Sequence, residues 1–375
     1  MDADQLRLLQ LNGSLYEQGR QYGEEDRETI HLAQSYWTQD VANDGIDPES
    51  FALALSLQQE IRLSLERYAP NFMAFMRGVA AGAGLPLHRL LAQNMMDEDW
   101  WLRRSLKQSD LLPKHAEKCS TVAGPSTQGM LAAQNLDIQP WVEGSQVVLG
   151  LEGPDGVRAM VAAVGGVPSC GVNDRGVATL LNTVIQLRSQ GAGLPVCGFQ
   201  FEVLFQPSAM AVYSLVTSVA HCSGHAYTAV DPAWIYAAEC SAGGVALASA
   251  DERGIFLRTN HPLASTDLRD ATNESERAVL RSISTTHQRY AQMRDRLASV
   301  EILDNDAVIA ALSCRVVEGA PVSRQLGDVQ NIDGSVNIGY TSISMLAELP
   351  RDGDVRLHVA PGPPAITAYR EFRFS

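Results

Sequence analysis

The hydrophobic pattern of this 375-residue chain changes its period at one position, Cys119. Before Cys119, apolar residues recur every three or four positions, which is typical of amphipathic helices. After it, short apolar runs are separated by Gly, Pro, Asp and Asn, which is typical of strands joined by turns. Helices followed by runs of strands favour antiparallel sheets covered by helices over an alternating parallel fold. The period change therefore predicts an α+β protein with a junction at Cys119.

The same periodicity predicts where the elements lie. Helices are expected over 14–38, 50–67, 71–81, 86–101, 198–205, 208–220, 273–297 and 304–315. Strands are expected over 130–135, 145–152, 157–164, 169–172, 177–182, 225–230, 234–240, 244–248, 255–260, 338–347, 355–360 and 368–374. Gly19 and Gly23 are expected to be weak points of the first helix. Residues 103–118 are rich in Lys and Arg, contain Pro113 and show little periodicity, which predicts an exposed linker before Cys119.

Charge and composition disfavour several classes of function. The net charge is -14 and the sequence pI is about 5.0, so nucleic acid and an anionic membrane surface would repel the protein. The first residues carry acids and no apolar core, and no apolar run approaches about 18 residues, so we expect a cytoplasmic protein. The spacing of His221, Cys222 and His225 resembles part of a metal site. No second ligand cluster accompanies it, so we expect neither a metal nor a cofactor.

Cys119 is the residue with the clearest chemical potential. A free thiol is only a few per cent thiolate at neutral pH, so a nucleophilic cysteine needs a nearby proton acceptor. If the peptide bond between Lys118 and Cys119 were cleaved, the new α-amino group would lie on the same residue as the thiol. Such an amine has a pKa of about 7.7 to 8.0 and can accept that proton.

Several segments resemble one family when they are taken together. They are KCSTV at 118–122, MLAAQNLD at 130–137, GVNDRGVATLLN at 171–182, SGHAYTAVD at 223–231, RTNHP at 258–262 and VAPGPP at 359–364. In this order they resemble the acyl-coenzyme A:6-aminopenicillanic acid acyltransferase family of N-terminal nucleophile hydrolases. The resemblance covers most of the chain. It implies a four-layer αββα sandwich, with two antiparallel sheets between helix layers. It also implies self-cleavage into 1–118 and 119–375, which remain together as one structural domain.

The resemblance assigns roles to four residues. It implies that the chain is cut between Lys118 and Cys119, and that Cys119 is then the nucleophile. Asp137 matches the acid that would hold the α-amine and set its pKa. Asn260 matches the asparagine whose amide stabilises the oxyanion of the tetrahedral intermediate.

Four further residues have weaker assignments. Asn135 is expected to support the fold or contact the substrate, and Arg289 and Arg324 are cationic candidates for substrate contact. His261, beside the predicted oxyanion donor, invites a cysteine–histidine pair. We expect it to be structural, because the resembled family uses the asparagine.

Three functions remain open on the sequence alone. The first is a self-processing cysteine amidohydrolase acting on small N-acyl or aminoacyl amides, and the overall acidity favours amine-bearing substrates such as β-alanyl amides. The second is an acyl-coenzyme A-dependent N-acyltransferase, which would share the same acyl-enzyme. The third is an unprocessed binding scaffold, because the family has glycine where this chain has Lys118. The expected partners are the amide substrate, the chain's own N-terminal fragment and, as an open alternative, a second copy of the chain.

Overall fold

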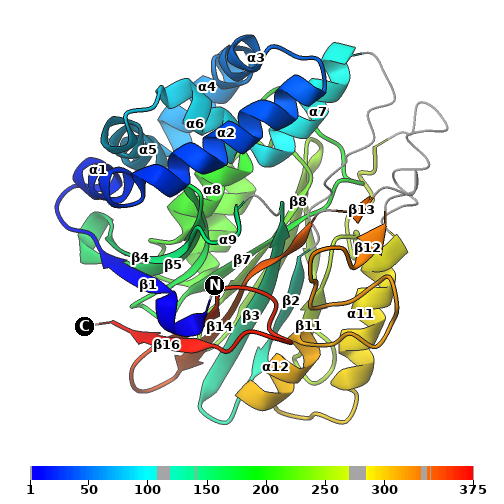
Figure 1. Ribbon diagram of the computed structural model, residues 1–375. Coiled ribbons are helices and arrows are strands. Elements are labelled where there is room, and N and C mark those ends of the chain that lie inside the picture. The colour runs from blue at the N-terminus through cyan, green and yellow to red at the C-terminus, as the bar shows by residue number, and fades with distance from the viewer. Residues whose placement is uncertain are drawn as a thin grey trace.

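The computed structural model describes residues 2–107, 119–139, 142–269, 284–330, 336–337 and 339–374. Two sheets pack face to face, and helices cover the outer face of each (Figure 1). One apolar cluster lies between the first helix layer and the eight-stranded sheet, a second lies between the sheets, and a third lies under the last two helices. Three buried interfaces define four layers, so the predicted α+β αββα sandwich is confirmed.

The helices form the two outer layers. The first layer contains α1 (Leu15–Glu25), α2 (Arg27–Asn43), α3 (Pro48–Ser56), α4 (Gln59–Tyr68), α5 (Pro70–Ala83), α6 (Leu87–Asn94), α7 (Met96–Lys107), α8 (Val196–Val203) and α9 (Ala209–Ser218). The second layer contains α11 (Ser284–Arg296) and α12 (Asn305–Leu312). No helix of the described segments is long and apolar enough to cross a bilayer.

The eight-stranded sheet has the order β1-β4-β5-β6-β7-β8-β9-β10. Its strands are β1 (Arg7–Gln10), β4 (Gln146–Glu152), β5 (Arg158–Val164), β6 (Val167–Asn173), β7 (Ala178–Thr183), β8 (His225–Val230), β9 (Ile235–Ser241) and β10 (Gly244–Ala248). All neighbours are antiparallel except β1, which the sequence did not predict and which pairs with β4 in parallel.

The six-stranded sheet has the order β11-β2-β3-β14-β15-β16 and is antiparallel throughout. Its strands are β11 (Phe256–Arg258), β2 (Ser120–Pro125), β3 (Gly129–Ile138), β14 (Tyr340–Pro350), β15 (Arg356–Ala360) and β16 (Arg370–Arg373). A separate pair joins β12 (Val329–Gln330) to β13 (Val336–Asn337). Every residue of β3 is buried, because one face meets the other sheet and the opposite face meets the helix layer.

Three predicted helices are each two helices. The predicted 14–38 helix breaks at Asp26, the 50–67 helix breaks at Leu57 and Gln58, and the 86–101 helix breaks at Met95. Asp26 leaves the helical conformation at φ -108° and ψ 21°, and its buried carboxylate pairs with Arg7 of β1. Spacing of apolar residues does not reveal such breaks, because a short turn can keep the three- to four-residue interval.

The predicted linker is also partly wrong. Residues 103–107 belong to α7, and 108–118 lie outside the described residues. Arg103 holds this end of α7 by ion pairs to Asp99, one turn earlier, and to Asp40 of α2 at 2.7 Å. Arg103, which looks like part of a solvated linker in the sequence, therefore neutralises acids of the helix layer. The predicted 273–297 helix is described only from Ser284, as α11.

Gly19 and Gly23 lie inside α1 and are not weak points. A Cβ atom on Gly19 would lie 2.0 Å from the carbonyl oxygen of Phe75, and one on Gly78 would lie 2.0 Å from that of Tyr16. These glycines let α1 and α5 cross with their backbones in contact, which no larger residue allows.

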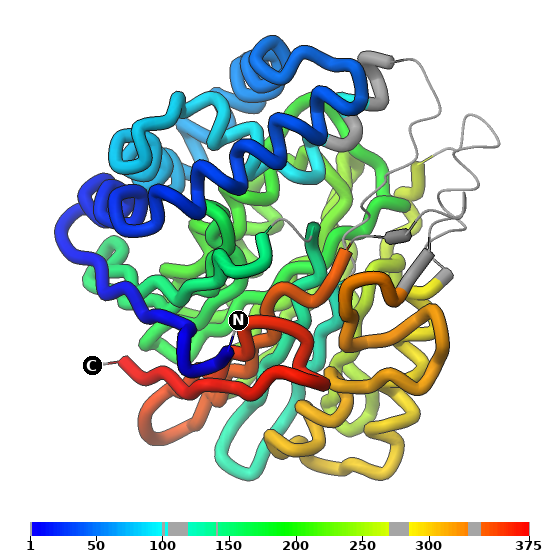
Figure 2. Tube along the Cα trace, in the orientation of Figure 1, coloured from blue at the N-terminus to red at the C-terminus, as the bar shows by residue number. Residues whose placement is uncertain are grey.

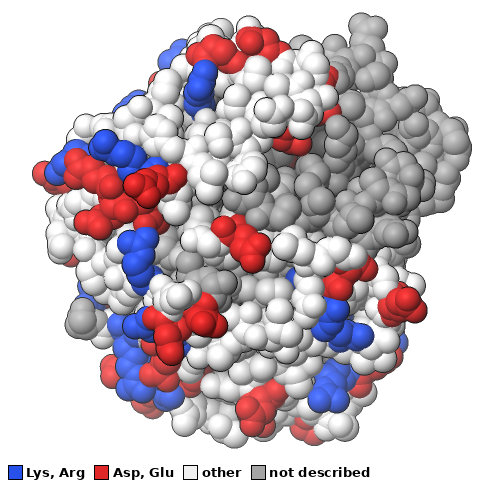
Figure 3. Space-filling model, in the orientation of Figure 1, with Lys and Arg blue, Asp and Glu red and all other residues white. Residues whose placement is uncertain are grey.

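The N-terminal segment runs beside β16, the last strand of the chain (Figure 2). Arg370 of β16 donates from Nη1 to the carbonyl oxygen of Leu6 at 2.7 Å, just before β1. The N-terminal segment thus supplies an edge strand to one sheet and contacts the edge strand of the other. On the face shown in Figure 3, acidic and basic side chains are mixed and gather densely over α1.

Candidate active site

Cys119 lies immediately before β2, with 2% of its surface exposed. The next residue, Ser120, pairs with Asn135 of β3, and the Cys119 side chain belongs to the apolar cluster between the sheets. The predicted cleavage position thus falls at the start of a strand inside the core. Lys118 lies outside the described residues.

Asp137 is on the neighbouring strand, two residues beyond the partner of Ser120. It is 1% exposed, and its Oδ1 accepts a hydrogen bond from Thr341 Oγ1 at 2.7 Å. Arg289 and Arg324 each interact electrostatically with both Asp137 and Cys119. The predicted acid and the predicted nucleophile therefore lie in one electrostatic neighbourhood.

Asn260 follows β11, the other neighbour of β2. Its Nδ2 donates to the carbonyl oxygen of Thr183 at 2.9 Å, and its backbone N–H donates to Thr286 Oγ1 at 2.7 Å. Just before it, Arg258 forms a buried ion pair with Glu239 of β9. Glu239 also accepts the backbone N–H groups of residues 263–265. This network ties the loop of Asn260 to both sheets.

Arg289 of α11 connects Asn260 to Cys119. Its Nη1 donates to the Cys119 carbonyl oxygen and to Ser120 Oγ, and its Nη2 donates to Asn260 Oδ1, each at 2.8 Å. The side chain is 0% exposed. Burial lowers the pKa of Arg289 to about 10, with Asp137 partly opposing the shift, so the guanidinium stays charged at neutral pH.

Arg324 is the second buried guanidinium. It is 1% exposed, and its three side-chain nitrogens have no hydrogen-bond partner in the part of the chain that the structure describes. Burial lowers its pKa, while Asp137, Asp328 and Cys119 oppose that shift. Its backbone N–H donates to Thr341 Oγ1 at 2.9 Å, the hydroxyl that donates to Asp137. The five N–H donors of this guanidinium thus have no acceptor among the described residues, and its charge interacts with Cys119 and Asp137.

Asn135 has its hydrogen bonds inside the protein. Its Nδ2 donates to the carbonyl oxygens of Leu312 and Val322, and its Oδ1 accepts from Ser344 Oγ. These contacts tie β3 to the end of α12, which agrees with the expected role in the fold. Its alternative role in substrate contact stays a prediction.

His261 turns toward α11. Its Nδ1 lies 3.0 Å from Thr286 Oγ1, and its ring packs against His287 with the centroids 4.1 Å apart. Burial lowers the pKa of His261 to about 4, helped by His287 and two arginines, so the ring is neutral at neutral pH. These contacts hold the ring against α11, and the structural role of His261 stays a prediction.

Asn182 belongs to the candidate site, although no role was predicted for it. It ends the segment GVNDRGVATLLN, is 0% exposed, and accepts a hydrogen bond from Thr121 Oγ1 at 2.8 Å. Its Nδ2 has no partner among the described residues. The next residue, Thr183, holds Asn260. The sequence contained a signal for Asn182, because a side-chain amide at the end of a predicted buried strand needs hydrogen-bond partners.

The residues of the apparent metal motif face different partners. His221 contacts the carbonyl oxygen of Val216, Cys222 donates to that of Gly193, and His225 contacts Asp97. Among the described residues, no group of three or more His, Cys, Asp or Glu side chains could hold a metal ion.

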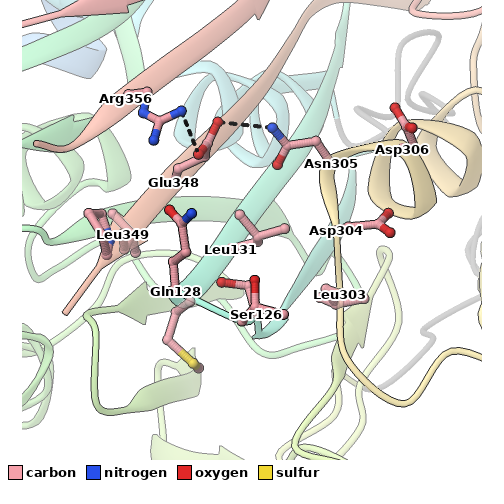
Figure 4. Close-up of a pocket in the computed structure, with 13 residues that line it drawn as sticks. Ser126, Gln128, Leu131, Leu303, Asp304, Asn305, Asp306, Glu348, Leu349 and Arg356 are labelled. Atoms are coloured by element: carbon pink, nitrogen blue, oxygen red, sulfur yellow. Dashed lines mark hydrogen bonds and ion pairs between the residues drawn. The ribbon is translucent and has the colours of Figure 1, made fainter. Parts of the chain in front are cut away.

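A separate pocket of about 350 Å³ lies at the opposite end of β2 from Cys119 (Figure 4). Glu348 is one of its lining residues, and it accepts from Asn305 Nδ2 at 2.9 Å and pairs with Arg356 at 3.3 Å. Asp304, also in its lining, caps α12 through a 2.7 Å bond from Ala307 N. Each of these side chains has a partner within the protein, and we assign the pocket no role.

No protein-family model matches the sequence, and no curated protein matches it. Among solved structures, two variants of the conjugated bile acid hydrolase from Clostridium perfringens are similar to it. They have 11% and 10% identity and a TM-score of 0.41, and the match covers 68% of this chain and 97% of theirs. Penicillin V acylase from Agrobacterium tumefaciens is similar with 11% identity and a TM-score of 0.43, over 68% of this chain and 86% of the other. The narrower resemblance to the penicillin acyltransferase family stays a prediction.

Proposed function

We propose that this protein is an amidohydrolase that cleaves its own chain between Lys118 and Cys119 and then hydrolyses small N-acyl or aminoacyl amides through a Cys119 acyl-enzyme. The observation that carries the proposal is the position of Arg289. Its guanidinium donates, at 2.8 Å in each case, to the carbonyl oxygen of Cys119 and to Oδ1 of Asn260. The proposed nucleophile and the proposed oxyanion donor, far apart in the sequence, thus bond to one side chain.

Self-cleavage would begin with attack of the Cys119 thiol on the carbonyl carbon of Lys118. The C–N bond breaks, the nitrogen takes the thiol proton and becomes the α-amine, and Lys118 is held as a thioester. Water then hydrolyses the thioester, which leaves a carboxyl group on Lys118 and a free thiol on Cys119. Because β1 and the first helix layer pack against the 119–375 segment, fragment 1–118 would stay bound as part of one domain.

Turnover would use the α-amine of Cys119 as the base. The amine takes the thiol proton, and sulfur attacks the carbonyl carbon of the substrate amide. Asp137 would hold the resulting ammonium. When the tetrahedral intermediate collapses, its C–N bond breaks and the ammonium gives its proton to the leaving amine. Water then attacks the thioester, which releases the acid and restores the thiol.

Two amides would stabilise the oxyanion in this proposal. Asn260 Nδ2 carries two protons, of which the carbonyl of Thr183 accepts one. Asn182 Nδ2 has no partner among the described residues. Donors fixed before the reaction stabilise developing charge without reorganising, and one such donor contributes about 3 to 4 kcal/mol.

The charge next to Cys119 differs in sign from that of the whole chain. Arg289 and Arg324 supply two positive charges against the one negative charge of Asp137. An acidic group on the substrate could accept hydrogen bonds from Arg324, whereas the overall acidity favoured amine-bearing substrates. We therefore rank N-acyl amides that carry a carboxylate ahead of β-alanyl amides.

The test combines intact mass with a substrate panel. Wild-type protein is expected as two associated fragments, 1–118 and 119–375, whereas Cys119→Ala stays one chain and Cys314→Ala, a matched cysteine control, cleaves normally. The processed protein is then incubated with acidic N-acyl amides, β-alanyl amides and acyl-coenzyme A thioesters, with and without an added amine.

The possible outcomes distinguish the hydrolase, the acyltransferase and the binding scaffold. Free acid from amides, regardless of added amine, supports the hydrolase. Product that requires both a thioester and an amine identifies an acyltransferase instead. An intact chain after prolonged incubation, with no turnover, contradicts self-processing and favours the binding scaffold.

A further inference from the structure

We propose that Arg289 is a positioning residue of this site, whose guanidinium decides which atoms of Asn260 and Cys119 face the reacting carbonyl. The inference rests on the proposed function and deepens it, because it gives Arg289 a role other than the substrate contact expected from the sequence. Arg289 is fully buried on α11, and its hydrogen bonds described above go to the protein itself.

The first part of the role concerns the orientation of Asn260. An arginine side chain has five N–H donors and no acceptor, so it can bond only to the oxygen of the Asn260 amide. The 2.8 Å bond from Nη2 to Oδ1 therefore directs the NH₂ group away from Arg289, toward the carbonyl of Thr183. Without Arg289, the amide could rotate by half a turn and present an oxygen, which would repel an oxyanion.

The second part concerns the backbone of Cys119. Nη1 donates at 2.8 Å to the Cys119 carbonyl oxygen and, at the same distance, to Ser120 Oγ. These bonds fix the first peptide unit of β2, and with it the position of the Cα atom that carries the thiol and the future α-amine. A planar guanidinium can hold both ends of this arrangement, whereas an ammonium is a single point of contact.

The third part is electrostatic. A positive charge close to a cysteine stabilises its thiolate, which is the nucleophilic form. The charge of Arg289 interacts with Cys119, and the site is buried, so solvent screens the interaction weakly. Arg289 therefore supplies charge and orientation together, and substitutions can separate the two.

The experiment compares Arg289→Lys, Arg289→Gln and, as a control on the same helix, Arg294→Gln. Arg294 is exposed and pairs only with Asp295 at 3.0 Å among the described residues. Cysteine labelled with ¹³C at Cβ reports thiol ionisation by NMR without a reagent having to reach the core, and Cys119→Ala assigns the signal. The rate of cleavage between 118 and 119, kcat and KM complete the readouts, and circular dichroism confirms folding.

We expect Arg289→Lys to keep the wild-type pH midpoint of the Cys119 thiol and to lower kcat by about 10- to 100-fold, with a smaller change in KM. Arg289→Gln is expected to raise the midpoint by about one pH unit. In an Asn260→Ala background, Arg289→Lys should lower kcat much less than in the wild type, because the group that it orients is already absent. Arg294→Gln should match the wild type in every readout.

Three results would overturn the inference. They are wild-type kcat in Arg289→Lys, an unchanged thiol midpoint in Arg289→Gln, or effects that add fully to those of Asn260→Ala. If Arg289→Gln does not fold, the Lys variant and the cycle with Asn260→Ala decide the orienting role. If no amide in the panel is hydrolysed, the proposed function fails, but the NMR titration and the cleavage rate still test Arg289.

Discussion

Replacing Asn260 with alanine tests the proposed chemistry most directly. The substitution removes the amide whose Nδ2 bonds to the Thr183 carbonyl and whose Oδ1 bonds to Arg289. It leaves the thiol of Cys119 and its future α-amine in place. If Asn260 stabilises the oxyanion, the loss falls on the transition state and leaves ground-state binding nearly unchanged.

The structure sets the size of the expected effect. Of the two Nδ2 protons, one serves Thr183, so the variant loses a single oxyanion donor. That loss corresponds to a kcat about 10²- to 10³-fold lower, or about 2.7 to 4 kcal/mol, with a smaller change in KM. Asn182 would still supply its amide, so some activity should remain. Initial rates on the best amide of the panel, at saturating and low substrate, give both constants.

The neighbouring residue provides the control. His261→Ala removes a buried ring that contacts Thr286 and His287, but no proposed oxyanion donor. It should therefore retain more activity than Asn260→Ala. The reverse order would refute the reasoning and favour a cysteine–histidine enzyme. Urea unfolding of both variants separates a loss of kcat from a loss of folded protein, since Asn260→Ala also removes one hydrogen bond from Arg289 and one from the Thr183 carbonyl.

Two predictions concern stability. Gly78→Ala should lower the free energy of unfolding by about 1 to 3 kcal/mol, because its Cβ would lie 2.0 Å from the Tyr16 carbonyl oxygen. The exposed neighbour Arg77→Ala should change it by about 0.5 kcal/mol or less, and equal urea midpoints would contradict the crossing of α1 and α5. Burial lowers the pKa of His221 and of His261 to about 4 from 6.5, so the unfolded chain binds more protons and stability should fall as pH drops from about 6.5 to 4. Each histidine contributes at most about 3 to 4 kcal/mol to this loss of stability, and His221→Phe should flatten the slope of urea stability against pH.

Much of the fold was predictable, because burial imposes a period on the sequence. The helical period before Cys119 and the short apolar runs after it gave the two kinds of element and their order. The break at Asp26 was not predictable, since its buried carboxylate pairs with Arg7, which belongs to another element of the fold. The glycines of α1 were misread for the same reason, because their partner helix α5 begins far along the chain.

The sequence by itself determined the residue types that the proposed chemistry needs, namely a thiol at a strand start, an acid at a strand end and an amide in a turn. Their order and spacing follow the chain, so a family pattern can identify them. Only the tertiary structure decided how they are held. Arg289 contacts Cys119 and Asn260 because α11 packs on β11, and the Arg324 side chain has no acceptor among the described residues although its backbone N–H donates to Thr341. Hydrogen bonding is directional and short in range, whereas the periodicity of a sequence records only which residues are buried.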